Sequence, residues 1–66
     1  MDQKEIAKRL IEIWDVINFL CDECHDYEYI PALREVMDKL YLKLSPENQK
    51  KFIDWLIKGL EKKAGV

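Results

Sequence analysis

The chain has 66 residues, of which 48% are hydrophobic and 36% are charged, and its eleven basic and thirteen acidic side chains give a net charge of −2. This composition predicts a single folded domain over residues 1–66 and excludes intrinsic disorder, because the chain has enough apolar residues to form a core. Basic side chains are not clustered as they are in proteins that neutralise nucleic-acid phosphates. We therefore expect no nucleic-acid partner.

Apolar residues recur at alternating spacings of four and three over the first third of the chain. This heptad pattern is typical of a helix with one buried stripe. Asp2 is a suitable N-cap, and Glu5 three residues later would complete a capping box. The pattern predicts a long helix over about residues 3–25. Its stripe is formed by Ile6, Leu10, Ile13, Ile17, Leu20 and Cys24.

Two prolines mark the starts of two shorter helices. Pro31 precedes a second apolar face, which predicts a helix over about residues 31–44. Ser45 is a suitable N-cap, followed by proline at the first helical position and an acid in the first turn. These signals predict a third helix over about residues 46–63. The sequence therefore predicts an all-α protein, a small three-helix bundle with a tight Ser-Pro corner. Gly59 lies on the inward side of the third helix, which predicts a close helix approach there.

Several large apolar side chains fall outside these buried faces. On the first helix Phe19 projects almost opposite Ile17, and Ile11 lies to one side of the stripe. Trp55 and Ile57 fall on opposite flanks of the third helix. Such surplus apolar surface indicates a second buried interface, and a homodimer is the simplest way to supply one. We predict that Ile11, Phe19, Trp55 and Ile57 form a dimer interface that completes the bundle.

Both cysteines and the single histidine form the string Cys21-x-x-Cys24-His25. The string matches the attachment motif of c-type haem, for which Met37 could serve as the distal iron ligand. The motif nevertheless continues the apolar heptad pattern, and cysteine is among the residue types most often buried. We therefore interpret Cys21 and Cys24 as structural core residues and expect no bound cofactor.

A metal site is the alternative interpretation of the same three side chains. On a helix Cys21 faces both Cys24 and His25, so three ligands could converge. Zinc binds four ligands, and Asp26 or Glu28 could supply the fourth. Alternatively, two chains could each give Cys21 and His25 across a two-fold axis. Thiol redox chemistry is less favoured, because the surrounding carboxylates disfavour the thiolate.

Acidic and aromatic side chains gather where the first predicted helix ends. We call the following six residues the acidic corner: Asp22, Glu23, Asp26, Tyr27, Glu28 and Tyr29. A helix C-terminus already carries partial negative charge, so four carboxylates there oppose the helix dipole. Tyrosine is enriched at protein interfaces. The acidic corner is thus a candidate surface for another protein with a basic surface, and a solvated loop without a partner explains the same residues.

The sequence shows no catalytic constellation. Its one serine is the predicted helix cap, and its histidine lies near no nucleophile except a poorly activated cysteine. No apolar run approaches the roughly 20 residues of a membrane span, and the first residues do not resemble a signal peptide. We therefore predict a cytoplasmic, non-enzymatic protein interaction or regulatory module with no membrane partner. The alternative is a metal- or haem-binding protein that uses Cys21, Cys24 and His25.

Overall fold

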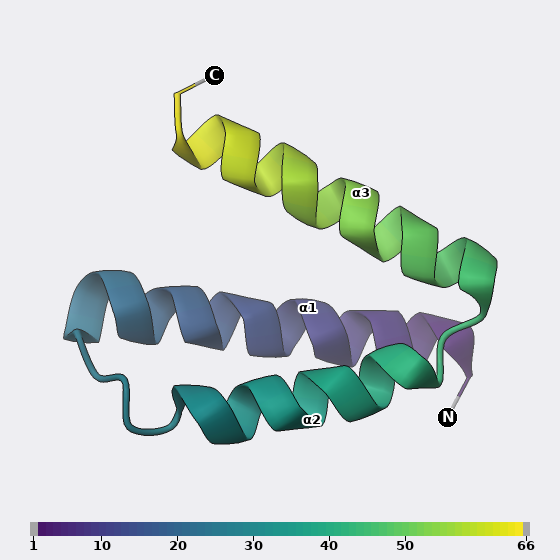
Figure 1. Ribbon diagram of the computed structural model, residues 1–66, viewed down its shortest axis with the longest axis horizontal. Coiled ribbons are helices and arrows are strands. Elements are labelled where there is room, and N and C mark those ends of the chain that lie inside the picture. Colours follow the sequence, from purple (N-terminus) through teal and green to yellow (C-terminus); the bar gives the residue numbers. More distant parts are fainter. Residues whose placement is uncertain (1, 66) are drawn as a thin grey trace.

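The computed structural model describes residues 2–65 (Figure 1). Within this range the chain forms three α-helices: α1 (Gln3–Phe19), α2 (Ile30–Leu42) and α3 (Pro46–Lys63). A π-helical turn, η1 (Leu20–Cys24), continues α1, and no β-strand occurs between residues 2 and 65. The predicted all-α architecture with three helices is confirmed.

The helices pack most closely at one end of the molecule. Figure 1 shows α1 and α2 running antiparallel, while α3 leaves the corner beside the start of α1 and diverges from α2 toward its C-terminus. The buried core lies at the closed end of this arrangement and consists of Ile6, Leu10, Leu40, Leu44 and Phe52. Phe52 is the buried residue that α3 contributes. The C-terminal half of α3 is therefore held much less firmly than its N-terminal half.

The start and the buried face of α1 follow from the sequence pattern. The Asp2 carboxylate accepts a hydrogen bond from the backbone N–H of Glu5 at 2.8 Å, so the predicted N-cap is confirmed. Ile6, Leu10 and Ile17 are buried on one stripe. The α-helix nevertheless ends at Phe19, earlier than predicted, because the next turn adopts π-helical hydrogen bonding.

Cys24 is exposed, so its predicted position in the core is wrong. The wider π turn changes the direction of its residues relative to a continuous α-helix. The segment after Cys24 is also an open connection, over residues 25–29, and not a packed helix. Cys21 is half-buried and is the one of the two cysteines that packs against neighbouring residues.

The corner between α2 and α3 is tied to the start of α1 by the side chain of Gln3. Gln3 Oε1 accepts hydrogen bonds from the backbone N–H of Ser45 and from Nδ2 of Asn48, both at 2.9 Å. Gln3 Nε2 donates to the carbonyl oxygen of Lys43 at 3.1 Å. Ser45 Oγ in turn accepts from the backbone N–H of Asn48 at 3.3 Å, which confirms Ser45 as the N-cap of α3. These bonds fix the direction in which α3 begins.

Candidate functional site

The acidic corner is built on a π-helical turn and one left-handed residue. The backbone N–H groups of His25 and Asp26 both donate to the carbonyl oxygen of Leu20, which satisfies an acceptor that the helix end would otherwise leave without a partner. His25 adopts φ 51° and ψ 34°. The left-handed region favours glycine, and π turns often occur at functional sites.

His25→Gly is expected to stabilise the fold by about 1 kcal/mol, because glycine removes the steric cost of the left-handed conformation. His25 is exposed, so little packing is lost with the imidazole. Thermal unfolding followed by circular dichroism measures the change, with His25→Ala as the control that removes the ring but keeps the Cβ atom. A melting temperature that falls with glycine would show that the imidazole stabilises this turn more than the backbone strain costs.

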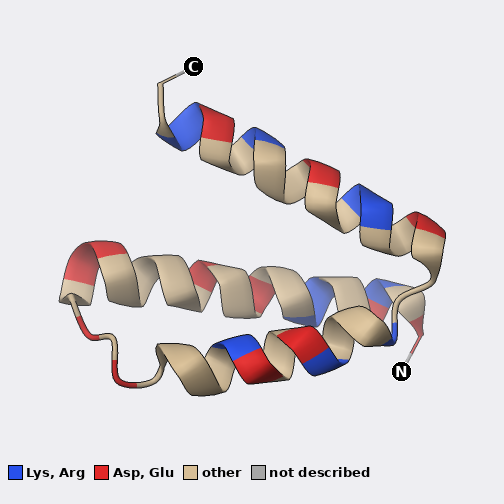
Figure 2. Ribbon diagram, viewed as in Figure 1, with Lys and Arg blue, Asp and Glu red and all other residues tan. Residues whose placement is uncertain are grey.

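The residues of the acidic corner reach solvent around this turn. Figure 2 shows acidic segments at the end of the first helix and along the connection to α2. Asp26 is half-buried, and the other five corner residues are exposed. The rings of Tyr27 and Tyr29 are large apolar surfaces on residues that are 58% and 59% exposed. The structure therefore places Asp22 and Glu23 on η1 and the other four residues on the connection that follows it.

Local hydrogen bonds hold part of the corner in place. Asp26 Oδ1 accepts from the backbone N–H of Glu28 at 3.2 Å, which forms an Asx turn. His25 Nδ1 lies 3.4 Å from the hydroxyl oxygen of Tyr27. These contacts orient the loop backbone and one of the two tyrosine rings, so the corner is an ordered loop.

Only some of the carboxylates remain available to a partner. Asp22 forms an ion pair with Lys63 at the end of α3. Glu23 and Glu28 are exposed, and their carboxylates take part in none of the ion pairs or side-chain hydrogen bonds described for residues 2–65. The sequence could not have indicated this division, because it depends on where α3 ends in space.

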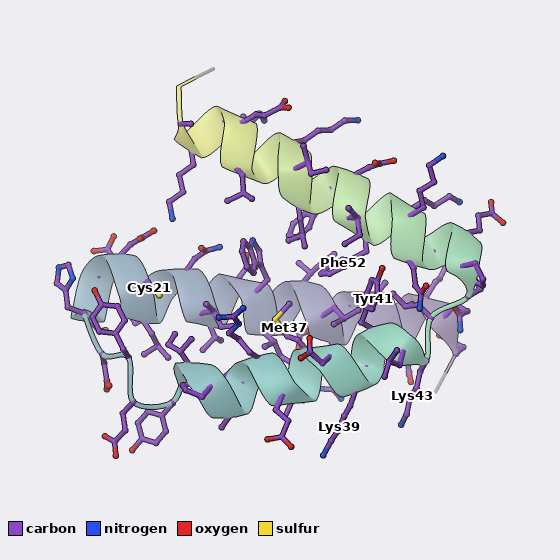
Figure 3. The ribbon with its side chains drawn as sticks, viewed as in Figure 1. Cys21, Met37, Lys39, Tyr41, Lys43 and Phe52 are labelled. Atoms are coloured by element: carbon purple, nitrogen blue, oxygen red, sulfur yellow. The ribbon has the colours of Figure 1, made fainter. Side chains whose placement is uncertain are left out.

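The three candidate metal ligands do not form a site. Across residues 2–65, no three His, Cys, Asp or Glu side chains are grouped so that they could hold a metal ion. Cys21 is half-buried, whereas Cys24 and His25 are exposed at the end of the turn. Met37, the imagined haem ligand, packs against the core cluster (Figure 3). The positions of these residues therefore do not support the alternative interpretation as a metal- or haem-binding protein.

An apolar groove opens between α2 and α3, and we call it the α2–α3 groove. It consists of two adjoining hollows of about 440 Å³ and 250 Å³ that share Met37 and Asp38. Residues of α1 and α2 line both hollows, and α3 lines the smaller one through Phe52, Ile53 and Leu56. Its main apolar lining residues are Leu10, Ile17, Met37, Tyr41, Ile53 and Leu56. Figure 3 shows the side chains of Met37 and Tyr41 over α1 and that of Phe52 between α1 and α3. The sequence indicated surplus apolar surface but not this groove.

The four predicted interface residues do not line one common hollow. Ile11 and Trp55 line a second hollow of about 360 Å³ between α1 and α3. Ile11 also packs against the core cluster, so part of its surface is already buried. Phe19 and Ile57 are exposed on different helices, and neither lines this hollow. A Cβ atom built on Gly59 would meet nothing within 4 Å, so the predicted close approach at Gly59 is wrong.

No protein-family model matches this chain, and no curated protein or solved structure shows significant similarity to it. None of the helices described between residues 2 and 65 is long and apolar enough to cross a membrane. The function is therefore inferred from the chain's own surfaces.

Proposed function

We propose that this chain is a non-enzymatic protein interaction module of the cytoplasm that binds a basic partner at the acidic corner and acts as a homodimer. The observation that carries this proposal is the combination of two exposed tyrosines and two unengaged carboxylates on η1 and the loop that follows it. The two free cysteines accord with a reducing compartment. The apolar surface left open by the divergence of α3 supports self-association.

The chemistry of the corner favours a cationic partner surface. Asp22 and Glu23 lie at a helix end whose dipole is also negative, and Asp26 and Glu28 follow in the loop, so the local potential attracts Lys and Arg side chains and raises the rate of encounter. Tyr27 and Tyr29 offer large contact areas whose ordering costs little side-chain entropy. The left-handed conformation of His25 is a strained feature of the kind that is often retained at functional sites.

Charge reversal tests the role of the corner. After capture of the partner from a lysate, its binding to the purified chain is measured by calorimetry at low and at physiological salt. The variant Glu23→Lys/Glu28→Lys is expected to weaken binding about tenfold or more at low salt, with a smaller effect at higher salt because of screening. Glu23→Lys places a cation near the C-terminus of the first helix, where it is favourable, and Glu28→Lys changes an exposed loop residue, so the fold is expected to remain intact.

The matched control is Glu12→Lys/Glu35→Lys. It changes the net charge by the same amount on exposed positions of α1 and α2, at the cost of two weak intrahelical ion pairs. We expect this control to bind within about threefold of the unchanged chain. Equal weakening by both variants would show that only overall charge matters and would contradict a specific role for the corner.

A further inference from the structure

We propose that the α2–α3 groove is covered by α3 of a second copy of this chain, so that two chains form a symmetric dimer around an antiparallel pair of α3 helices. This inference rests on the homodimer of the proposed function and names its surface. Unlike the dimer interface predicted from the sequence, this interface does not include Phe19 or the flank of α1.

The first argument is the area that the single chain leaves exposed. The chain has an accessible surface of 5238 Å², whereas a folded monomer of 7.9 kDa is expected to have about 4,400 Å². The excess of about 800 Å² is what one partner buries in an interface of standard size. Burial of this excess area therefore requires about one partner surface of standard size.

The second argument is the apolar face of α3, which is wider than its contacts with α1 and α2 can cover. Phe52 is buried and Leu56 is half-buried, and both belong to the side that meets the core. Ile53, Ile57 and Leu60, at positions i, i+4 and i+7, are 40%, 48% and 52% exposed. This spacing forms one continuous stripe on a helix, and such a stripe suits insertion into a groove of another helical protein.

The stripe and the groove lie next to each other on one molecule. Ile53 belongs to both, since it lines the groove wall and begins the exposed stripe. A symmetric dimer requires a patch that is complementary to itself, and a ridge beside a groove meets this requirement. Divergence of α3 toward its C-terminus leaves this side of the helix open for an added helix.

The third argument is the charge pattern beside the stripe. At about 100° per residue, Lys50 and Glu61 fall on the same flank of α3, next to Ile57. Lys50 lies near the beginning of the helix and Glu61 near its end, and both are exposed. An antiparallel pair therefore places Lys50 beside Glu61 of the partner subunit, twice in each dimer. In this register Ile53 and Ile57 of one helix lie between stripe residues of the other, and Leu60 lies just beyond the end of the other stripe.

Sedimentation equilibrium tests the dimer from about 1 µM to about 500 µM, a range that includes weak interfaces. The unchanged chain is expected to approach twice its mass of 7.9 kDa as the concentration rises. Ile57→Asp is expected to raise the dissociation constant about 100-fold or more, because it buries an unpaired charge at two places in the dimer. Circular dichroism at low concentration checks that the helices of the variant remain.

Phe19→Asp is the matched control, because Phe19 is 57% exposed and lies on α1, away from the proposed interface. We expect Phe19→Asp to leave the dissociation constant unchanged within about threefold. A monomer over the whole range would overturn the inference. Loss of the dimer with Phe19→Asp would also overturn it, since the interface would then include the flank of α1.

A charge swap tests the antiparallel arrangement without disturbing the fold. Lys50→Glu and Glu61→Lys are each expected to weaken the dimer about fivefold, because two attractive contacts become repulsive. The double variant restores both pairs and is expected to return within about twofold of the unchanged chain. Each single change places its new charge at the favourable end of the helix dipole, so unfolding does not explain weaker association. Additive weakening in the double variant would overturn the antiparallel pairing.

The outcomes separate this inference from the proposed function. A monomeric chain that still binds its basic partner through Glu23 and Glu28 would contradict the inferred dimer but not the proposed role of the acidic corner. A chain that dimerises through α3 but binds its partner equally well after charge reversal would contradict the proposed role of the acidic corner but not the inferred dimer.

Discussion

Leu10→Ala is expected to lower the free energy of unfolding by about 3–5 kcal/mol. Leu10 is 0% exposed and is the most completely buried of the large side chains described between residues 2 and 65. It lies in the core cluster with residues from α2 and α3, so the cavity left by alanine borders all three helices. A fold of this size has only about 3–5 kcal/mol from a single core, so the variant is expected to be largely unfolded as a monomer.

Urea unfolding followed by circular dichroism measures the loss, at a low protein concentration where dimerisation does not contribute. Leu42→Ala is the matched control, because Leu42 is a leucine of similar helical context that is exposed at the end of α2. We expect Leu42→Ala to change the free energy of unfolding by less than about 0.5 kcal/mol. A comparable loss in both variants would place Leu42 in an interface and not on a free surface.

Phe52→Ala is expected to cost about 3–5 kcal/mol and to detach α3 from the other two helices. Phe52 is the buried side chain of α3. Its ring is stacked against Trp55 with centroids 5.9 Å apart, and it meets Tyr41 at 6.3 Å in a tilted arrangement. Aromatic pairs of this kind contribute beyond their buried area. No other residue of α3 described here is buried to the same degree.

The fluorescence of Trp55 reports this detachment when Trp14 is replaced by phenylalanine in the background. Loss of the stacked ring is expected to expose the indole and shift its emission to longer wavelength. Ile53→Ala provides the control, since Ile53 is a partly exposed apolar residue of the same helix and is expected to cost about 1 kcal/mol. An unchanged emission in Phe52→Ala would show that other contacts hold α3 in place.

The helices could be predicted from the sequence because their signals are local. Asp2 and Ser45 cap the helices that they were expected to cap, and the spacing of Ile6, Leu10 and Ile17 identifies the buried side of α1. Capping and periodicity depend on residues within one or two turns of each other. A single sequence therefore contains all that these predictions require.

The features that escaped prediction depend on distant parts of the chain. The heptad pattern places Cys24 on the apolar stripe. It does not show that this turn is π-helical or that α2 begins only at Ile30, so the exposure of Cys24 could not be foreseen. Gly59 suggested a close contact that the divergence of α3 prevents. The sequence did not indicate a role for Gln3, because polar residues are common in the first turn of a helix. Its role becomes visible only when the fold brings the corner near Ser45 beside it.

The hydrogen bonds of Gln3 have a consequence for the order in which the chain folds. They join residues 40 to 45 positions apart, whereas α1 and α2 are connected by residues 25–29 alone. Closing a long loop costs more conformational entropy than closing a short one, and local contacts generally form first. We expect the α1–α2 hairpin to assemble before α3 docks, and α3 to leave first when the molecule opens. The far end of α3 is joined to η1 by the exposed Lys63–Asp22 ion pair, and exposed pairs of this kind contribute little to stability. The proposed dimer partner therefore meets the last element to fold.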